Sequence, residues 1–210
     1  MMPRNLTLFP DSEPAFELPA GMRYEPGFLA LDEEEALVAD LRKLSFRSFT
    51  MHGVEAKRHV AHFGLSYEYN SGASKPGDPM PAFILALRER VGAWMEQDPT
   101  SFVEALVNEY PVGAGIGWHV DAPQFGEVVG VSLLSSSRFK LRPLTPSSGT
   151  PVELAIAPRS IYLLSGEVRW QWQHHIPPAK EPRYSITFRT LREPNDASTA
   201  PLAGREGLSN

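Results

Sequence analysis

Short runs of β-forming residues, punctuated by Pro or Gly, fill the second half of this chain. They cover residues 105–110, 128–134, 138–141, 152–156, 160–164 and 184–191. Many short strands at close spacing are typical of an antiparallel sandwich or jelly roll, whereas a parallel sheet would alternate its strands with helices. We therefore expect a mainly β fold with flanking helices.

The first half of the chain predicts helices and loops instead. The acidic run 32–35 precedes an apolar stretch and predicts a helix with Asp32 as the cap and Glu35 as its third residue. A second helix is expected from Pro81 to about residue 97, after a Gly-, Ser- and Pro-rich loop over 67–79. Within one compact domain we expect an extended arm (1–20), an α/β region (21–103), a β core (104–192) and a flexible tail (193–210).

The composition excludes several classes of function. The chain has no cysteine, so disulfides, thiolate zinc sites and cysteine nucleophiles are excluded, and nitrogen and oxygen must hold any metal. A net charge of −5 argues against a protein that wraps duplex DNA, although 57–59 and 138–142 are compact basic clusters. Because no apolar run is long enough for a signal peptide or a membrane span, we expect a cytoplasmic monomer without membrane contact.

A split set of metal-ligand residues lies in the β region. His119 and Asp121 are two residues apart, so on a strand their side chains would point to the same face, and His174 would come from a neighbouring strand. Two imidazoles and one carboxylate form the facial triad that holds non-haem Fe(II) and leaves coordination positions open. The bland alternatives are a surface loop at His119 and a structural histidine at either His174 or His175.

The last β run carries two arginines on one face. Arg183 and Arg189 alternate with Tyr184, Ile186 and Phe188, which form an apolar face. The arginines then lie on the opposite face, which in a small barrel is the interior. An interior guanidinium needs an anionic partner, and a small dicarboxylate would supply one, whereas a solvated sheet edge is the alternative.

The order of these motifs resembles the AlkB family of Fe(II)- and 2-oxoglutarate-dependent dioxygenases. The resemblance is carried by residues 108–111, 119–121, 132–134, 158–167, 170–177 and 183–189. Among these, the run 170–177 selects His174 over His175 as the family's histidine. The resemblance implies a double-stranded β-helix (jelly roll) core preceded by an α/β nucleotide-recognition lid.

The family's cofactor sites carry over residue by residue. The implied Fe(II) ligands, which also form the catalytic centre, are His119, Asp121 and His174. The implied 2-oxoglutarate contacts are Asn108, Tyr110, Arg183, Ser185 and Arg189. In this pattern Tyr110 and Arg183 hold the far carboxylate, Arg189 supports the carboxylate beside the keto group, and Ser185 replaces a common Asn.

The resemblance also implies a substrate. It predicts oxidative demethylation of N-alkylated bases, such as 1-methyladenine and 3-methylcytosine, in single-stranded DNA or RNA, as in alkylation-damage repair. Tyr67 and Tyr69 could stack on a flipped base, and Lys57 and Arg58 could meet phosphates. The alternatives are core aromatics and a solvated charge run.

Two residues depart from the repair-type pattern and leave other substrates open. Leu65 stands where an aromatic residue is common, and Pro123 replaces an acidic residue that some repair members use against the base. The same iron chemistry could instead hydroxylate a tRNA base, a protein side chain or a small metabolite. A catalytically silent jelly-roll binding module is the non-enzyme alternative, which the complete residue set opposes.

Overall fold

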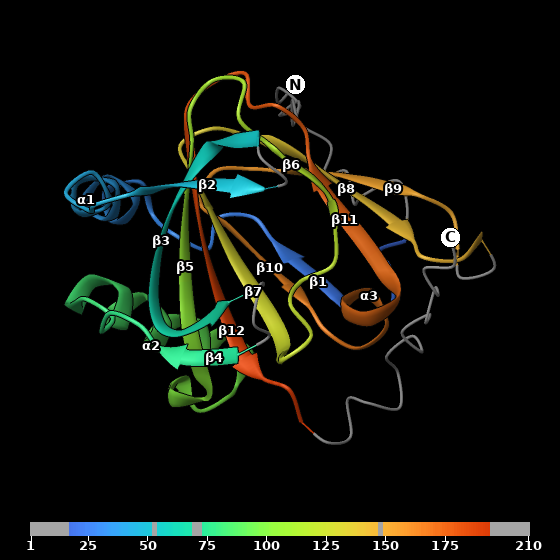
Figure 1. Cartoon of the computed structure of the whole chain (residues 1–210), viewed down its shortest axis with the longest axis horizontal. Coiled ribbons are helices and arrows are strands. Elements are labelled where there is room, and N and C mark those ends of the chain that lie inside the picture. The colour runs from blue at the N-terminus through green and yellow to red at the C-terminus, as the bar shows by residue number, and fades with distance from the viewer. Residues whose placement is uncertain (1–16, 52–53, 69–72, 147–148, 194–210) are drawn as a thin grey trace, which may run out of the picture.

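The computed structural model describes residues 17–51, 54–68, 73–146 and 149–193. Two β-sheets pack face to face, and helices cover the outer face of the larger sheet (Figure 1). This arrangement confirms the expected mainly β jelly roll with flanking helices. Most of the predicted arm and all but the first residue of the predicted tail lie outside the described residues.

The larger sheet has eight strands in the described part of the chain, in the order β1-β10-β7-β12-β5-β3-β2, with β4 paired to β3. Their bounds are β1 Met22–Glu25, β2 Arg47–Met51, β3 Val54–Glu68, β4 Ala73–Pro76, β5 Phe102–Tyr110, β7 Phe125–Leu133, β10 Ser160–Leu164 and β12 Arg183–Leu191. All these neighbours pair antiparallel.

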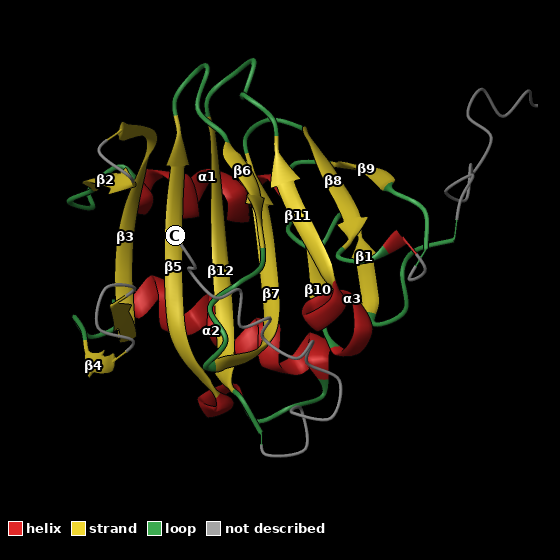
Figure 2. Ribbon diagram, turned by 45° about the vertical axis from the view of Figure 1, so that its right-hand side comes forward, coloured by secondary structure: helices red, strands yellow, loops and turns green. Residues whose placement is uncertain are grey.

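The smaller sheet has the order β6-β11-β8-β9, again antiparallel. Its strands are β6 Ile116–His119, β8 Ser137–Pro143, β9 Val152–Ile156 and β11 Trp172–Ile176. The helices are α1 Leu31–Leu41, α2 Ala82–Met95, the 3-10 turn η1 Pro99–Ser101 and the short α3 Gly166–Gln171. Figure 2 shows α1 and α2 behind the strands of the larger sheet.

Strict alternation on β12 separates two cores. Tyr184, Ile186 and Phe188 face α1 and α2 and join the core between the helices and the larger sheet. The second core lies between the sheets and includes Phe139 of β8 and Tyr162 of β10. The other face of β12, which begins with Arg183, therefore points between the sheets, as the period-two pattern predicted.

Several local predictions are wrong. Helix α1 begins at Leu31 with Ala30 as its N-cap, and the Glu33 carboxylate accepts the Ala30 backbone N–H at 2.7 Å, so Asp32 is not the cap. The expected loop over 67–79 is partly a hairpin, because β3 continues to Glu68 and β4 pairs with it. Strands β1, β2, β3, β6 and β11 carry no clear β pattern in the sequence.

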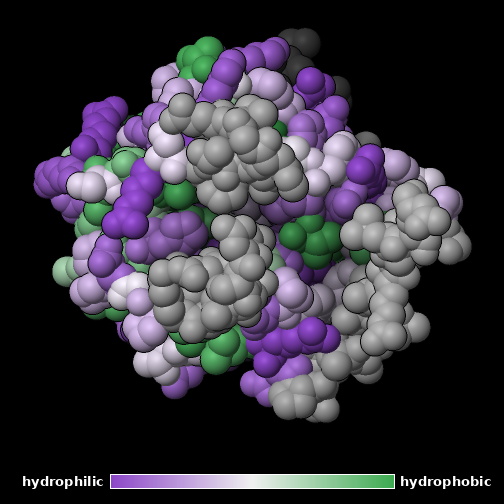
Figure 3. Space-filling view, in the orientation of Figure 1, coloured by the Kyte–Doolittle hydropathy of each residue, from purple (hydrophilic) through white to green (hydrophobic). Residues whose placement is uncertain are grey.

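The surface gives two further facts. In the described part of the chain, no helix has both the length and the apolar character needed to cross a membrane. On the face in view in Figure 3, the described side chains are mostly hydrophilic, and the hydrophobic ones form small patches.

Candidate active site

Three of the predicted residues converge between the sheets. His119 ends β6 and stands opposite His174 on β11, and Asp121 follows β6 by two residues. Their potential ligand atoms all lie within 4.8 Å of one another, and His174 Nε2 is 3.4 Å from Asp121 Oδ2. Asp121 reaches the group from the loop rather than from the strand, which corrects the expectation that both members of the motif share a strand face.

The electrostatics keep Asp121 and His174 in the protonation states that metal ligands need. Burial, reinforced by the nearby His119, lowers the pKa of His174 to about 3, so its imidazole is neutral. Burial alone would raise the pKa of Asp121, but the Arg189 guanidinium holds that pKa well below its usual range, so Asp121 is ionised. His119 Nδ1 lies 2.9 Å from the Gly117 carbonyl oxygen, which leaves Nε2 for a ligand.

Arg189 is fully engaged by two carboxylates. Its Nε and Nη2 donate to Asp121 Oδ1 at 3.1 and 2.6 Å, and its Nη1 donates to Glu104 Oε2 at 2.7 Å. These two carboxylates raise the pKa of Arg189 against the effect of its burial. Glu104 was not predicted from the sequence; its only signal is that it shares the inner face of β5 with Asn108 and Tyr110.

Arg183 has open hydrogen-bonding capacity. Its side chain is 2% exposed, and its Nη2 donates to Ser132 Oγ at 2.9 Å. The Nε and Nη1 atoms are buried and have no hydrogen-bond partner among the described residues. The guanidinium carbon lies 4.6 Å from the centre of the Tyr110 ring. Because an unpaired buried cation is costly, this arrangement fits an anionic ligand.

Of the remaining predicted residues, Arg58, Asn108 and Ser185 form a near group beside the triad. Arg58 Nη1 donates to Asn108 Oδ1 at 2.5 Å, and Asn108 Nδ2 lies 3.4 Å from Ser185 Oγ. Lys57 is exposed at the start of the same segment of β3. The Tyr67 side chain and the whole of Tyr69 lie outside the described parts, so the structure does not place these predicted stacking residues.

A cavity of about 250 Å³ joins the near group to the converging triad. Its polar lining includes Arg58, Asn108, Tyr110, Arg183, Ser185, Arg189 and the triad. Its apolar walls include Val60, Leu106, Phe139 and Ile176. A polar end with apolar walls suits a small co-substrate beside a hydrophobic reacting group.

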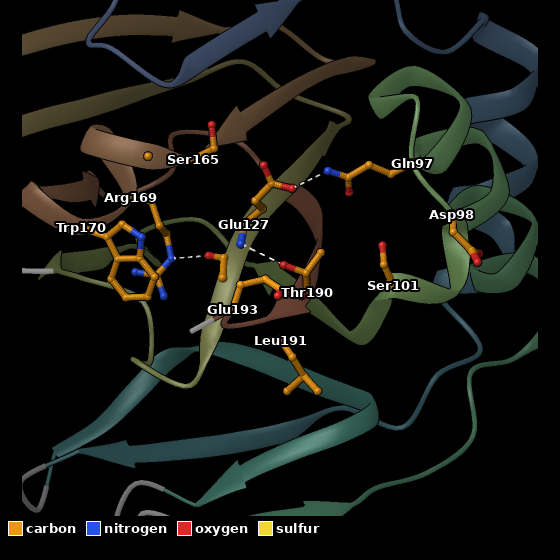
Figure 4. Close-up of a pocket in the computed structure, with 12 residues that line it drawn as sticks. Gln97, Asp98, Ser101, Glu127, Ser165, Arg169, Trp170, Thr190, Leu191 and Glu193 are labelled. Atoms are coloured by element: carbon orange, nitrogen blue, oxygen red, sulfur yellow. Dashed lines mark hydrogen bonds between the residues drawn. The ribbon is translucent and has the colours of Figure 1, made fainter. Parts of the chain in front are cut away.

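A second pocket, of about 430 Å³, is more polar (Figure 4), and no residue of the triad lines it. On its border Gln97 Nε2 donates to Glu127 Oε2 at 2.7 Å. The buried Arg169 of α3 also borders it and donates to the backbone oxygens of Ala122 and Gly126 at 2.9 and 2.7 Å. Arg169 therefore fixes the loop that carries Asp121, a role that the sequence did not indicate.

Comparison with known proteins defines the class. A model of the 2OG-Fe(II) oxygenase superfamily matches residues 21–192, and the chain belongs to this superfamily. It is an AlkB-like, 2-oxoglutarate-dependent dioxygenase with Fe(II) as its metal, as the order of motifs predicted.

The relatives and solved structures agree with this class. An Arabidopsis thaliana protein named alkylated DNA repair protein ALKBH8 homolog is 29% identical over 75% of this chain and 51% of its own length. A Xenopus tropicalis protein named tRNA (carboxymethyluridine(34)-5-O)-methyltransferase alkbh8 is 28% identical over 90% of this chain and 29% of its own length. The chain thus spans about half or less of these relatives.

Two solved structures share the fold. The structure of OsALKBH1 has a TM-score of 0.60 and 16% identity, covering 83% of this chain and 98% of that one. An oxidoreductase of the 2OG-Fe(II) oxygenase family from Burkholderia pseudomallei has a TM-score of 0.59 and 15% identity, covering 82% of this chain and 86% of its own.

Proposed function

We propose that this chain oxidises a modified base of single-stranded nucleic acid, with the cavity between the sheets as its active site. This proposal depends on the buried Nε and Nη1 atoms of Arg183, which have no hydrogen-bond partner among the described residues and lie in the same cavity as the converging triad. A metal-binding set and an unsatisfied buried cation in one small cavity are what Fe(II) and a dicarboxylate co-substrate require together.

The residues of the cavity then divide into metal ligands and contacts for 2-oxoglutarate. His119, Asp121 and His174 hold Fe(II) through two imidazole nitrogens and one carboxylate. Arg183 and the Tyr110 hydroxyl take the far carboxylate of 2-oxoglutarate. When bound, this pair of cofactors supplies the activation of O₂ and the oxidation of one C–H bond of the substrate. The apolar walls exclude water from that bond.

The other predicted contacts support the co-substrate. Asn108 and Ser185 lie next to each other on β5 and β12, where their cross-strand register places them directly opposite. Arg58 from β3 orients the Asn108 amide by donating to its oxygen. Arg189 acts here mainly through Asp121, since both edges of its guanidinium already meet carboxylates.

A basic strand face supports nucleic acid as the substrate class. The alternation on β8 buries Phe139 and Leu141 and turns Arg138, Lys140 and Arg142 outward. On the neighbouring strands of this outer face, Trp118 lies under the Arg142 guanidinium at 4.3 Å and its ring centre is 5.1 Å from that of His175. Cations interleaved with aromatic rings are typical of single-strand binding surfaces. Glu153 partly offsets the charge by pairing with Arg138 and Lys140.

We favour RNA, and a tRNA base in particular, because the Xenopus relative's name specifies a uridine of tRNA. The second candidate is demethylation of 1-methyladenine or 3-methylcytosine in single-stranded DNA or RNA, which the Arabidopsis relative's name supports. Pro123 is exposed and offers no carboxylate for an exocyclic amine, which weighs against the second candidate. We still expect the chain to be a cytoplasmic monomer.

The deciding experiment presents both substrates to the enzyme with Fe(II), 2-oxoglutarate and O₂. One is an anticodon stem-loop with a modified uridine at position 34, and the other is an oligonucleotide with 1-methyladenine or 3-methylcytosine. Succinate and an oxidised uridine from the first would support the favoured reading. Formaldehyde and a restored base from the methylated oligonucleotide would instead support the second candidate, demethylation.

The basic face gives an independent test of the substrate class. Replacing Arg138 and Arg142 by Glu should weaken binding of all single strands about equally and lower the salt slope by roughly one for each lost phosphate contact. Lys43→Glu, a charge reversal two residues after α1 on the opposite side of the larger sheet, is the control. Unchanged nucleic-acid binding in the double variant would remove this face from the proposal.

A further inference from the structure

Glu104 is a buried carboxylate that belongs neither to the proposed metal ligands nor to the proposed 2-oxoglutarate contacts. It is 2% exposed and lies on the inner face of β5. The strand register places it directly opposite Arg189 of β12 on one side and Gly64 of β3 on the other. A carboxylate so well removed from water must be held by specific partners.

The contacts of Glu104 form part of a polar row that crosses three strands. Its Oε2 accepts from Arg189 Nη1 at 2.7 Å, and its Oε1 lies 3.5 Å from Nδ1 of His62 on β3. The other edge of Arg189 donates twice to Asp121 Oδ1. The hydrogen-bonded row therefore runs from Glu104 through Arg189 to Asp121, and the cavity-lining His62 lies beside it, with its Nδ1 making no hydrogen bond among the described residues.

The two carboxylate oxygens of Asp121 have different partners. Oδ1 is taken by Arg189, whereas Oδ2 faces His174 Nε2 at 3.4 Å. We propose that Glu104 is a positioning residue: by fixing Arg189 it anchors Oδ1 and keeps Oδ2 directed at the metal position. The proposal rests on the proposed function of Asp121 as an iron ligand.

Charge balance gives Glu104 a second effect. Asp121 and Glu104 are two carboxylates, and Arg183 and Arg189 are two guanidiniums, so these four groups cancel. Fe(II) and the 2-oxoglutarate dianion also cancel, so Arg58, which lines the same cavity, leaves the loaded centre with a net positive charge. Without the Glu104 charge, this positive excess grows, which disfavours a metal ion but favours an anion. Loss of the Glu104 charge should therefore weaken metal binding and leave the affinity for 2-oxoglutarate undiminished.

The test uses Mn(II) as the metal probe and measures its dissociation constant without O₂. Glu104→Gln keeps the shape of the side chain and should weaken Mn(II) binding by about 10- to 100-fold, as loss of a group supporting a metal ligand does. The dissociation constant of 2-oxoglutarate, measured at saturating Mn(II), should not rise. The control is Glu109→Gln on the same strand, whose carboxylate meets His59 and Tyr184 on the other face, and it should bind Mn(II) within about twofold of the wild type.

A double variant separates positioning from damage to the fold. If Glu104 acts through Arg189, then adding Glu104→Gln to Arg189→Gln should cost clearly less Mn(II) affinity than Glu104→Gln costs in the wild type, because only its charge effect remains. Equal weakening of metal and 2-oxoglutarate, or full additivity in the double variant, would overturn the proposal. Unchanged Mn(II) affinity in Glu104→Gln would overturn the positioning role of Glu104 but leave the proposed function standing. A wild-type protein that binds no Mn(II) would overturn the proposed function as well.

Discussion

At the scale of residues, two arginines of one strand face differ in what they have left to bind. Arg189 meets Asp121 and Glu104 with both edges of its guanidinium. Arg183 donates through Nη2 to Ser132, and its Nε and Nη1 atoms have no hydrogen-bond partner among the described residues. Their spacing in the sequence made them look equivalent, but the carboxylates around them make only Arg183 available to an incoming anion.

Arg183→Lys should therefore impair 2-oxoglutarate specifically. An ammonium keeps the charge but lacks the planar fork that meets a carboxylate with two parallel bonds. We expect the KM for 2-oxoglutarate to rise about 10-fold or more, the equivalent of at least ~1.4 kcal/mol. Succinate formation at varied 2-oxoglutarate measures this, and metal affinity should stay unchanged. A normal KM would place the far carboxylate elsewhere.

Asp121→Ala should abolish iron-dependent succinate formation, because one of the three proposed ligands is lost. Arg189 keeps Glu104 as a partner, so the fold should survive with a loss of roughly 1–3 kcal/mol in the free energy of unfolding. Turnover assays and chemical denaturation check the two parts. Turnover retained in a folded variant would contradict the ligand assignment.

At the scale of elements, the sequence predicted the strands whose runs of β-formers lie between two clear boundaries. Strands β9 and β10 have the predicted bounds, and β12 differs by one residue. Strand β6, Ile116–His119, contains a Gly and is held by pairing with β11, so its own residues carry little signal. Glu104 could not be predicted as a partner of Arg189, because that contact depends on the register of β5 against β12.

Packing between strands is tight where the larger sheet faces the site. Gly130 of β7 lies against the ring of Tyr162 on β10, and a methyl group at this position would overlap that ring. Gly130→Ala should destabilise the fold by roughly 1–3 kcal/mol, because the buried ring must move. Thermal unfolding measures this, with Gly117→Ala as the control, since a methyl group there meets open space. Equal stability of both variants would mean that the Tyr162 ring can move aside at no cost in the free energy of unfolding.

At the scale of the whole molecule, the candidate site joins the two sheets. His119 and His174 belong to the smaller sheet, Arg183 belongs to the larger sheet, and Asp121 lies on the connection between them. The α1 side is tied to the same frame, because Glu34 accepts from Arg159 at 2.9 Å and from the Leu134 backbone N–H at 2.8 Å. A metal and a co-substrate bound here would therefore link both layers of the sandwich.

Ligand binding should consequently stabilise the entire fold. With Mn(II) and 2-oxoglutarate each near 100 times its Kd, each contributes about 2.7 kcal/mol. For a chain of this size each kcal/mol raises the Tm by roughly 2–4 °C, so each ligand should add ~5–10 °C. Differential scanning calorimetry without O₂ measures both increments. Arg183→Lys should lose the 2-oxoglutarate increment at a fixed concentration and keep the metal increment, whereas Asp121→Ala should lose both. Undiminished increments in Asp121→Ala would show that the ligands bind outside the cavity between the sheets.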